Sequence, residues 1–233
     1  MKKIFAVVLG AALMLSGTNV FAQLSVGAGW LNSTETTTYT NGDPDKSNFN
    51  GLYIGGQYNL PVVAGLGVAP GLYMTALFAN RTNESAQWGL TTNEKLQYRE
   101  FAVNVPVNVN YVFEVGRDFN IFLYAGPVFQ IAVSSKASYQ GSAGFAGIVG
   151  GTTGKYTLDY FSGKVTGPDG KVTDVKDGGY RNPFNIYLGG GAGIQAGQFQ
   201  VIIGYDHSLM NFSKANDEKA SRSQIKLGIG LSF

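Results

Sequence analysis

A single histidine, His207, is the residue best suited to act as a proton acceptor for a nucleophile near neutral pH. Asp206 precedes it and Ser208 follows it, so the residue types of a nucleophile, a base and a carboxylate are adjacent in the sequence. Neighbouring residues of a strand point to opposite faces, however, so His207 and Ser208 cannot meet directly if this segment is extended. Ser213 is a further candidate partner without diagnostic spacing. The sequence therefore predicts no catalytic residue and no enzyme.

Cofactor and metal chemistry have even less support. The chain has no Cys and one His, which excludes thiolate ligands and leaves no spacing of histidines and carboxylates suited to a metal. Residues 150–155 read Gly-Gly-Thr-Thr-Gly-Lys, which faintly resembles a phosphate-binding loop. That motif requires glycine at 149 and serine or threonine at 156, where the chain has Val149 and Tyr156. We expect a surface loop there, and no cofactor or metal.

Four charged residues are expected to face the interior of the fold: Glu100, Arg181, Asp206 and Lys226. Charges in a narrow interior are costly unless they are paired. If the last two strands pair symmetrically about their loop, Asp206 falls roughly opposite Lys226. Two interpretations stay open for this interior polar network: a gate or proton-coupled plug, or a satisfied network that fixes strand register. The second is favoured, because a small closed barrel encloses little more than its own side chains.

The elements that position these residues show a period of two. From Phe101 to Phe113 the odd positions are all apolar, whereas the even positions include Glu100, Asn104 and Asn108. The final segment, 223–233, alternates in the same way and ends on the aromatic Phe233. Similar patterns predict strands at 24–31, 51–60, 66–79, 100–113, 121–133, 181–196, 199–210 and 223–233.

The N-terminus has the features of a secretory signal. Lys2 and Lys3 precede an apolar stretch of roughly a dozen residues, which is too short to span a bilayer. Small side chains favour cleavage between Ala22 and Gln23, so residues 23–233 are expected to form one domain. The 17 Lys and Arg and 15 Asp and Glu then become 15 of each after cleavage (17 − 2 = 15), so overall charge gives no support for nucleic-acid binding.

Connections between the predicted strands alternate in length. Polar segments 32–50, 80–94, 134–179 and 211–222 are long, whereas 61–65, 114–118 and 197–198 are short. Eight strands with one apolar face and this alternation predict an all-β fold, an eight-stranded antiparallel up-and-down transmembrane β-barrel. Aromatic girdles are expected near Trp30, Phe129, Phe184 and Tyr205 at one rim, and near Tyr58, Phe113 and Phe233 at the other.

Five sets of short motifs lie in these segments: Tyr98-Arg99-Glu100-Phe101 with Val105-Pro106-Val107, Tyr124-Ala125-Gly126-Pro127, Tyr187-Leu188-Gly189-Gly190-Gly191-Ala192-Gly193, Tyr205-Asp206 with Leu209-Met210-Asn211, and Leu227-Gly228-Ile229-Gly230-Leu231-Ser232-Phe233. On these residues the chain resembles the small outer-membrane β-barrels of Bacteroides-type bacteria, which are related in architecture to OmpA-type and OmpX-type barrels. The resemblance implies the outer membrane of a Gram-negative bacterium, periplasmic termini and extracellular long loops. It also implies contact with outer-membrane lipids and insertion by a barrel-assembly machinery that reads the strand ending at Phe233.

Three functions are compatible with the sequence. The leading one is a non-enzymatic surface barrel with a structural or interaction role through its long loops and an extracellular ligand that the sequence does not name. The second is a passive small channel or an accessory subunit of an envelope secretion system, which requires a continuous lumen. The third is a lipid-modifying enzyme, which requires a catalytic His207 rather than a histidine at the outer-leaflet interface.

Overall fold

The computed structural model describes residues 23–40, 42–87, 90–141, 154–215 and 217–233, without the side chains of 83–87 and 90–94. The predicted signal peptide at 1–22 lies outside the described residues, and so does most of the glycine-rich stretch at 150–155. Over the described ranges, no helix is long and apolar enough to cross a membrane.

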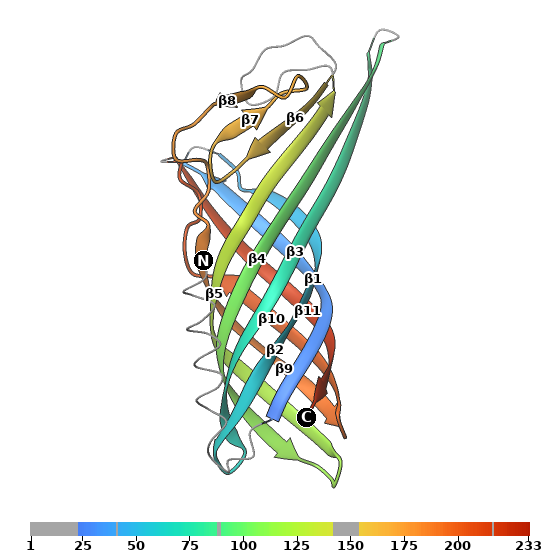
Figure 1. The fold of residues 1–233 in the computed structure, drawn as a ribbon, viewed down its shortest axis with the longest axis vertical. Helices are drawn as coiled ribbons and strands as arrows, with labels where there is room; N and C mark the ends of the chain where they lie inside the picture. Colours follow the sequence, from blue (N-terminus) through green and yellow to red (C-terminus); the bar gives the residue numbers. More distant parts are fainter. Residues whose placement is uncertain (1–22, 41, 88–89, 142–153, 216) are drawn as a thin grey trace.

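Eleven strands follow one another along this part of the chain (Figure 1). They are β1 (Gln23–Tyr39), β2 (Asp45–Val63), β3 (Leu66–Gln87), β4 (Leu90–Glu114), β5 (Phe119–Gly141), β6 (Gly154–Asp159), β7 (Lys164–Thr166), β8 (Val172–Asp174), β9 (Phe184–Ala196), β10 (Phe199–Ser208) and β11 (Glu218–Ser232). All the pairings between these strands are antiparallel.

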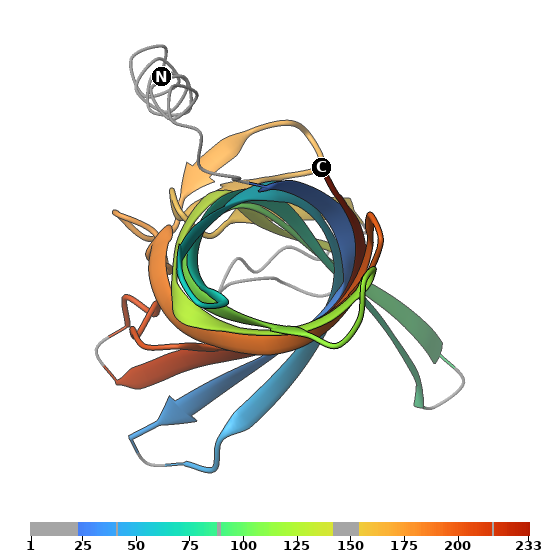
Figure 2. The ribbon, with the colours of Figure 1, turned by 90° about the horizontal axis from the view of Figure 1, so that it is seen from below.

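Eight of these strands, β1 to β5 and β9 to β11, form a closed ring in sequence order. β1 pairs with β2 on one side and with β11 on the other, from Ser25 opposite Ser232 upward, so the ring has no open seam at the chain ends. Figure 2 shows this ring from below. The fold is therefore the predicted eight-stranded antiparallel up-and-down β-barrel. Closure pairs the backbone groups that an open sheet would leave at its edges.

The barrel carries its apolar side chains on the outside. On β4, Phe101, Val105 and Val109 have exposed fractions of 46%, 39% and 52%, whereas Glu100, Asn104 and Asn108 are at most 6% exposed. Exposed apolar residues continue around the ring, with Trp30 on β1, Leu52 on β2, Leu123 on β5, Phe184 on β9, Tyr205 on β10 and Ile229 on β11. An exterior of this kind, on a barrel with a polar interior, suits contact with lipid.

Short turns gather at one end of the barrel, which is the lower end in Figure 1 and holds the C-terminus. Ala64 and Gly65 join β2 to β3 with φ values of 39° and 81°, and Gly197 begins the turn between β9 and β10 with φ 58°. These left-handed values match the right-handed twist of paired strands, and glycine reaches them without steric cost. The predicted short connections are confirmed.

Two of the predicted long loops are mostly strand. β1 continues to Tyr39 and β2 begins at Asp45, and their pairing runs up to Thr37 opposite Asp45. β3 and β4 stay paired up to Gln87 opposite Leu90. The prediction of loops at 32–50 and 80–94 is therefore wrong in these parts. Polar residues predominate in these segments of the sequence, so no hydrophobic alternation marks them as strands.

The long connection after β5 also contains regular structure. β5 itself extends to Gly141, and β6, β7 and β8 pair antiparallel beside its upper end, above the ring (Figure 1). Tyr139, Tyr156, Leu158 and Val165 form a small buried cluster that holds this annex together. The prediction of a loop over 134–179 is therefore only partly correct. At 211–222 the strand β11 already begins at Glu218, and β9 begins at Phe184 rather than at 181.

Tyrosine rings and glycines share the barrel interior. A Cβ atom on Gly191 would lie 2.2 Å from the Ile203 carbonyl oxygen and 2.5 Å from the Tyr124 hydroxyl. A Cβ on Gly228 would lie 2.0 Å from the Tyr53 hydroxyl. Real Cβ contacts do not become this short, so glycine is required where a strand passes beneath a tyrosine ring. The glycines of the last strands thus make room for the tyrosine rings of strands one or two places away in the ring.

Candidate functional site

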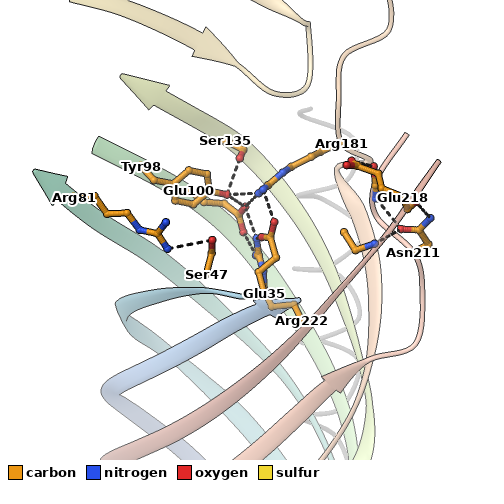
Figure 3. Close-up of polar contacts among 12 residues, drawn as sticks. Glu35, Ser47, Arg81, Tyr98, Glu100, Ser135, Arg181, Asn211, Glu218 and Arg222 are labelled. Atoms are coloured by element: carbon orange, nitrogen blue, oxygen red, sulfur yellow. Dashed lines mark hydrogen bonds and ion pairs between the residues drawn. The ribbon is translucent and has the colours of Figure 1, made fainter. Parts of the chain in front are cut away.

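Three buried charged side chains and a fourth that is partly buried meet inside the upper part of the barrel (Figure 3). Arg222 of β11 reaches Oε1 of Glu100 on β4 at 2.5 Å and Oε2 of Glu35 on β1 at 2.9 Å. Arg181, which precedes β9, reaches Oε1 of Glu35 at 2.5 Å and Oε2 of Glu100 at 4.0 Å. We name Glu35, Glu100, Arg181 and Arg222 the charge quartet. Its two cations and two anions balance.

Tyr98 completes the hydrogen bonding of the charge quartet. Its hydroxyl donates to Glu100 Oε2 at 2.5 Å, accepts from Arg181 Nη1 at 2.8 Å and lies 2.9 Å from Ser135 Oγ. These bonds join side chains from β4, β5 and the segment before β9. Buried charges are tolerated when hydrogen bonds satisfy them in this way. The quartet therefore ties distant parts of the chain together across the barrel.

Aromatic and aliphatic side chains cover the charge quartet. The Arg181 guanidinium carbon lies 4.4 Å from the centre of the Tyr160 ring, and that of Arg222 lies 5.1 Å from the centre of the Phe212 ring. A buried apolar cluster of Leu31, Phe49, Leu77, Tyr98 and Ala137 lies beside them. Charge pairs and rings thus occupy the upper barrel, beside a cavity of about 110 Å³ that Glu35, Tyr98, Tyr160 and Arg181 help to line.

Electrostatics keep Arg181, the member of the charge quartet that lies outside the strands, ionised. Burial alone would lower the pKa of the Arg181 guanidinium, but Tyr98 and Glu35 outweigh it and the pKa is raised above the ordinary value. Burial also raises the pKa of the nearby Tyr160 phenol, and the charge of Arg181 offsets part of that rise. Arg181 therefore stays charged, and Tyr160 stays a neutral ring against it, over the pH range in which proteins fold.

A second charged group lies at a different place in the interior. Lys226 Nζ and Asp206 Oδ2 form an ion pair, with Asp206 buried and Lys226 half-buried. Asp206 is directly opposite Gln224, and Lys226 is opposite Gly204, so the pair is diagonal across β10 and β11. Both residues line an interior cavity of about 70 Å³ together with Tyr53, Tyr73, Asn104, Asn108, Tyr124 and Gln200. The cavity is also lined by apolar side chains such as Phe122, Val128 and Ile202, and its polar groups would allow it to hold water.

The four residues predicted for the interior network fall into two groups. Glu100 and Arg181 belong to the charge quartet, whereas Asp206 and Lys226 form the separate pair. The sequence does not predict Glu35 and Arg222 as members of this network, because both lie in segments predicted to be loops. Leu31, Ser33 and Glu35 are all buried on the inner face of β1, but one apolar, one small and one charged residue give no alternation that the sequence could signal.

His207 lies outside the barrel and contacts a serine other than the one beside it. Its Nδ1 is 2.9 Å from Ser223 Oγ, and the Tyr205 hydroxyl donates to that same oxygen at 3.0 Å. Ser208 is buried on the opposite face and accepts a hydrogen bond from the Arg222 backbone N–H. Ser213 contacts Glu218 instead. Within the described ranges no cluster of metal-ligating side chains occurs.

The barrel and its interior define the class of the protein, a small β-barrel with an apolar outer belt. No family model and no curated protein matches the chain. Ail, the attachment invasion locus protein of Yersinia pestis, is similar in structure with 13% identity and a TM-score of 0.35, over 91% of this chain and 99% of that chain. Neisserial surface protein A has 14% identity and a TM-score of 0.40, over 90% and 97%. The N-terminal β-barrel domain of OprF from Pseudomonas aeruginosa has 11% identity and a TM-score of 0.31, over 88% and 97%.

Proposed function

We propose that this chain is a non-enzymatic integral β-barrel protein of a Gram-negative outer membrane, with a structural or surface-interaction role. The observation that carries this proposal is the pairing of an apolar exterior with a closed interior. A barrel that exposes Val105, Val109 and Ile229 on its outside requires lipid around it. The charge quartet and its aromatic rings lie across the upper lumen, so we expect no open passage through the barrel.

The proposal includes an orientation. The short turns and the C-terminus occupy one end of the barrel, and the extended hairpins and the β6–β8 annex occupy the other (Figure 1). Outer-membrane barrels keep their short turns in the periplasm and their long connections outside the cell. The extended ends of β3 and β4 would then project from the cell surface, where an extracellular ligand could meet them. Insertion by an assembly machinery that reads the strand ending at Phe233 belongs to the same proposal.

Planar-bilayer recordings test the closed interior. The purified barrel should insert and give no ion conductance, because the paired charges and the rings fill the upper lumen. Steady conductance of the unmodified chain would contradict the proposed role and favour a passive channel.

Cysteine labelling in intact cells tests the proposed orientation. Of two single cysteine substitutions, at Asp43 and at Glu114, only the one at Asp43 should react with a reagent added outside the cells.

One observation favours a second candidate, a lipid-modifying enzyme. A Ser223 hydroxyl that donates to His207 Nδ1 while accepting from Tyr205 is the arrangement of a nucleophile with its base. In the described part of the chain, however, no carboxylate contacts the His207 ring to orient it, as a complete triad requires. A changed lipid A profile in cells that carry His207→Ala, compared with unmodified cells, would establish this second function. An unchanged profile would exclude it.

A further inference from the structure

A β-bulge in β5 decides which of its side chains face outward above the apolar belt. Phe101 of β4 pairs with Ser134, but the next residue, Ala102, pairs with Ala132, so Val133 is an extra residue in β5. Ala132 is buried below this point and Ser135 is buried above it, so the inward positions change from even to odd numbers. Strict alternation would have turned Lys136 inward. Bulges at the rims of barrels re-aim side chains in this way.

The bulge places two cations side by side on the outer face. Lys136 is directly opposite Arg99 of β4, and both side chains are exposed. Neither side chain has an ion-pair or hydrogen-bond partner among the described residues. Asp159 of β6 is opposite Lys136, but its Oδ1 already accepts from the backbone N–H groups of Phe161 and Ser162. Like charges directly opposite each other are destabilising unless an anion lies between them. We name Arg99 and Lys136 the rim pair.

The rim pair lies immediately above the apolar belt. Arg99 is opposite Phe78 and is two residues above Phe101, or about 7 Å along the strand. Phe78 and Phe101 are both exposed, and their rings meet edge to face with centroids 6.3 Å apart. Aromatic rings of this kind mark the level where a barrel leaves the hydrocarbon. The two cations are therefore at the level of the lipid headgroups.

Further cations continue upward on the same face. Lys95 and Lys155 are both exposed and are both paired in register with Gln140, which lies between them on β5. Four cations and the single acid Asp159 give this outward face a net charge of +3 (4 − 1 = +3), counted over the described side chains of 95–99, 136–140 and 155–159. The chain has nearly equal numbers of acids and bases overall, so the excess is local.

We propose that the rim pair binds the phosphate of a membrane lipid headgroup in the outer leaflet. This inference rests on the proposed function, because it requires the apolar belt to lie in a bilayer. The Arg99 guanidinium can donate two parallel hydrogen bonds to a phosphate, and the Lys136 ammonium adds a point charge to the same group. The lipid's acyl chains would then lie along the apolar surface beside Phe101 and Val133. A phosphate between the two cations also removes their mutual repulsion.

Binding of lipid A to the detergent-solubilised full-length barrel tests this inference, with native mass spectrometry as the measurement. The unmodified protein should retain lipid A that carries its phosphates and should bind the dephosphorylated form roughly tenfold more weakly. The double change Arg99→Gln with Lys136→Gln should lower the affinity for the phosphorylated lipid to that of the dephosphorylated one. Lys136→Glu should also lower the affinity for phosphorylated lipid A. Because it gives Arg99 an acidic neighbour, β4 and β5 should stay paired in this variant.

The matched control removes two cations elsewhere. Lys164 and Lys171 each lie near an aspartate in the β7–β8 hairpin, and changing both to Gln alters net charge equally. This control should bind phosphorylated lipid like the unmodified chain. The inference would be overturned if the variant with Arg99→Gln and Lys136→Gln bound phosphorylated lipid A as tightly as the unmodified chain. Full displacement of lipid A by inorganic phosphate or by a polyglutamate peptide would also overturn it. Failure of the unmodified barrel to insert into lipid vesicles would instead overturn the proposed function.

Discussion

At the scale of single residues, stability depends on charges that are out of reach of water. Glu100 is 4% exposed and accepts hydrogen bonds from both Arg222 and Tyr98, so its removal leaves a buried guanidinium with one carboxylate fewer. Breaking a buried pair by removing one partner typically costs about 3–5 kcal/mol. Glu100→Leu should therefore lower the free energy of unfolding by about this amount, and the double change with Arg222→Met should lower it less. Urea unfolding in lipid vesicles measures both.

An exposed ion pair provides the comparison for this prediction. Lys164 Nζ lies 3.7 Å from Asp174 Oδ1, and both side chains are more than half exposed. Exposed pairs contribute about 0–1 kcal/mol, because water and salt screen them. Lys164→Met should therefore leave the unfolding curve nearly unchanged. If Glu100→Leu proved as mild as Lys164→Met, the charge quartet would not be a buried network.

The ion pair between Asp206 and Lys226 leads to a related prediction. Asp206 is 4% exposed, and its only ion-pair partner within the described ranges is Lys226. Lys226→Met leaves the carboxylate uncompensated, whereas Lys226→Met with Asp206→Leu replaces both charges by apolar groups. We expect the single change to destabilise the barrel more than the double change. An equal or reversed order in vesicle unfolding would contradict an uncompensated buried charge at Asp206.

At the scale of strands, the close approach of glycine backbone to a tyrosine ring sets the packing of β9 and β10. A Cβ atom on Gly204 would lie 2.2 Å from the Tyr124 hydroxyl, with its next contacts at 3.4 Å or more. A Cβ on Gly191 would also meet the Ile203 carbonyl oxygen at 2.2 Å, which is backbone and cannot move aside. Overpacking typically costs about 1–3 kcal/mol. Gly204→Ala should destabilise by about this much, and Tyr124→Phe should restore most of the loss.

Gly191→Ala serves as the comparison for that rescue, because Tyr124→Phe removes one of its three short contacts and leaves the Ile203 carbonyl oxygen at 2.2 Å and Tyr124 Cζ at 2.6 Å. We therefore expect the double variant at 191 and 124 to remain unstable, while the one at 204 and 124 recovers. Thermal unfolding, followed by the gel shift between folded and unfolded barrels, separates the two cases. Recovery of both would mean that the backbone of β10 moves to accommodate a methyl group.

Alternation in the sequence identified all eight barrel strands because each has an apolar outer face and a more polar inner face over most of its length. The same criterion failed above the belt, where β1 runs on through Glu35 and β11 begins before Arg222 with polar residues on both faces. The bulge at Val133 also has no signature in the sequence, since it depends on how β5 pairs with β4. Two members of the charge quartet and the outward position of Lys136 were therefore visible only in the structure.

At the scale of the whole molecule, the interior consists of two regions in series along the barrel axis. The lower one is the cavity of about 70 Å³ that Asp206 and Lys226 line, and the upper one is the charge quartet with its rings and a cavity of about 110 Å³ beside them. When two barriers lie in series, the higher one limits the passage of ions. Opening the lower region alone should therefore change ion conductance little. This arrangement predicts different effects of matched double changes on ion passage.

Asp206→Asn with Lys226→Gln should leave the barrel non-conducting in planar bilayers, because the upper region stays filled. Glu100→Ala with Arg222→Ala should open a narrow path, because it removes the two side chains whose shortest contact, 2.5 Å, crosses the upper lumen. Each double change removes one acid and one base, so net charge is the same in both. Tyr160 and Phe212 remain in place in either variant, which restricts the current to small ions. If the lower change produced conductance and the upper one did not, the charge quartet would not be the barrier that closes this barrel.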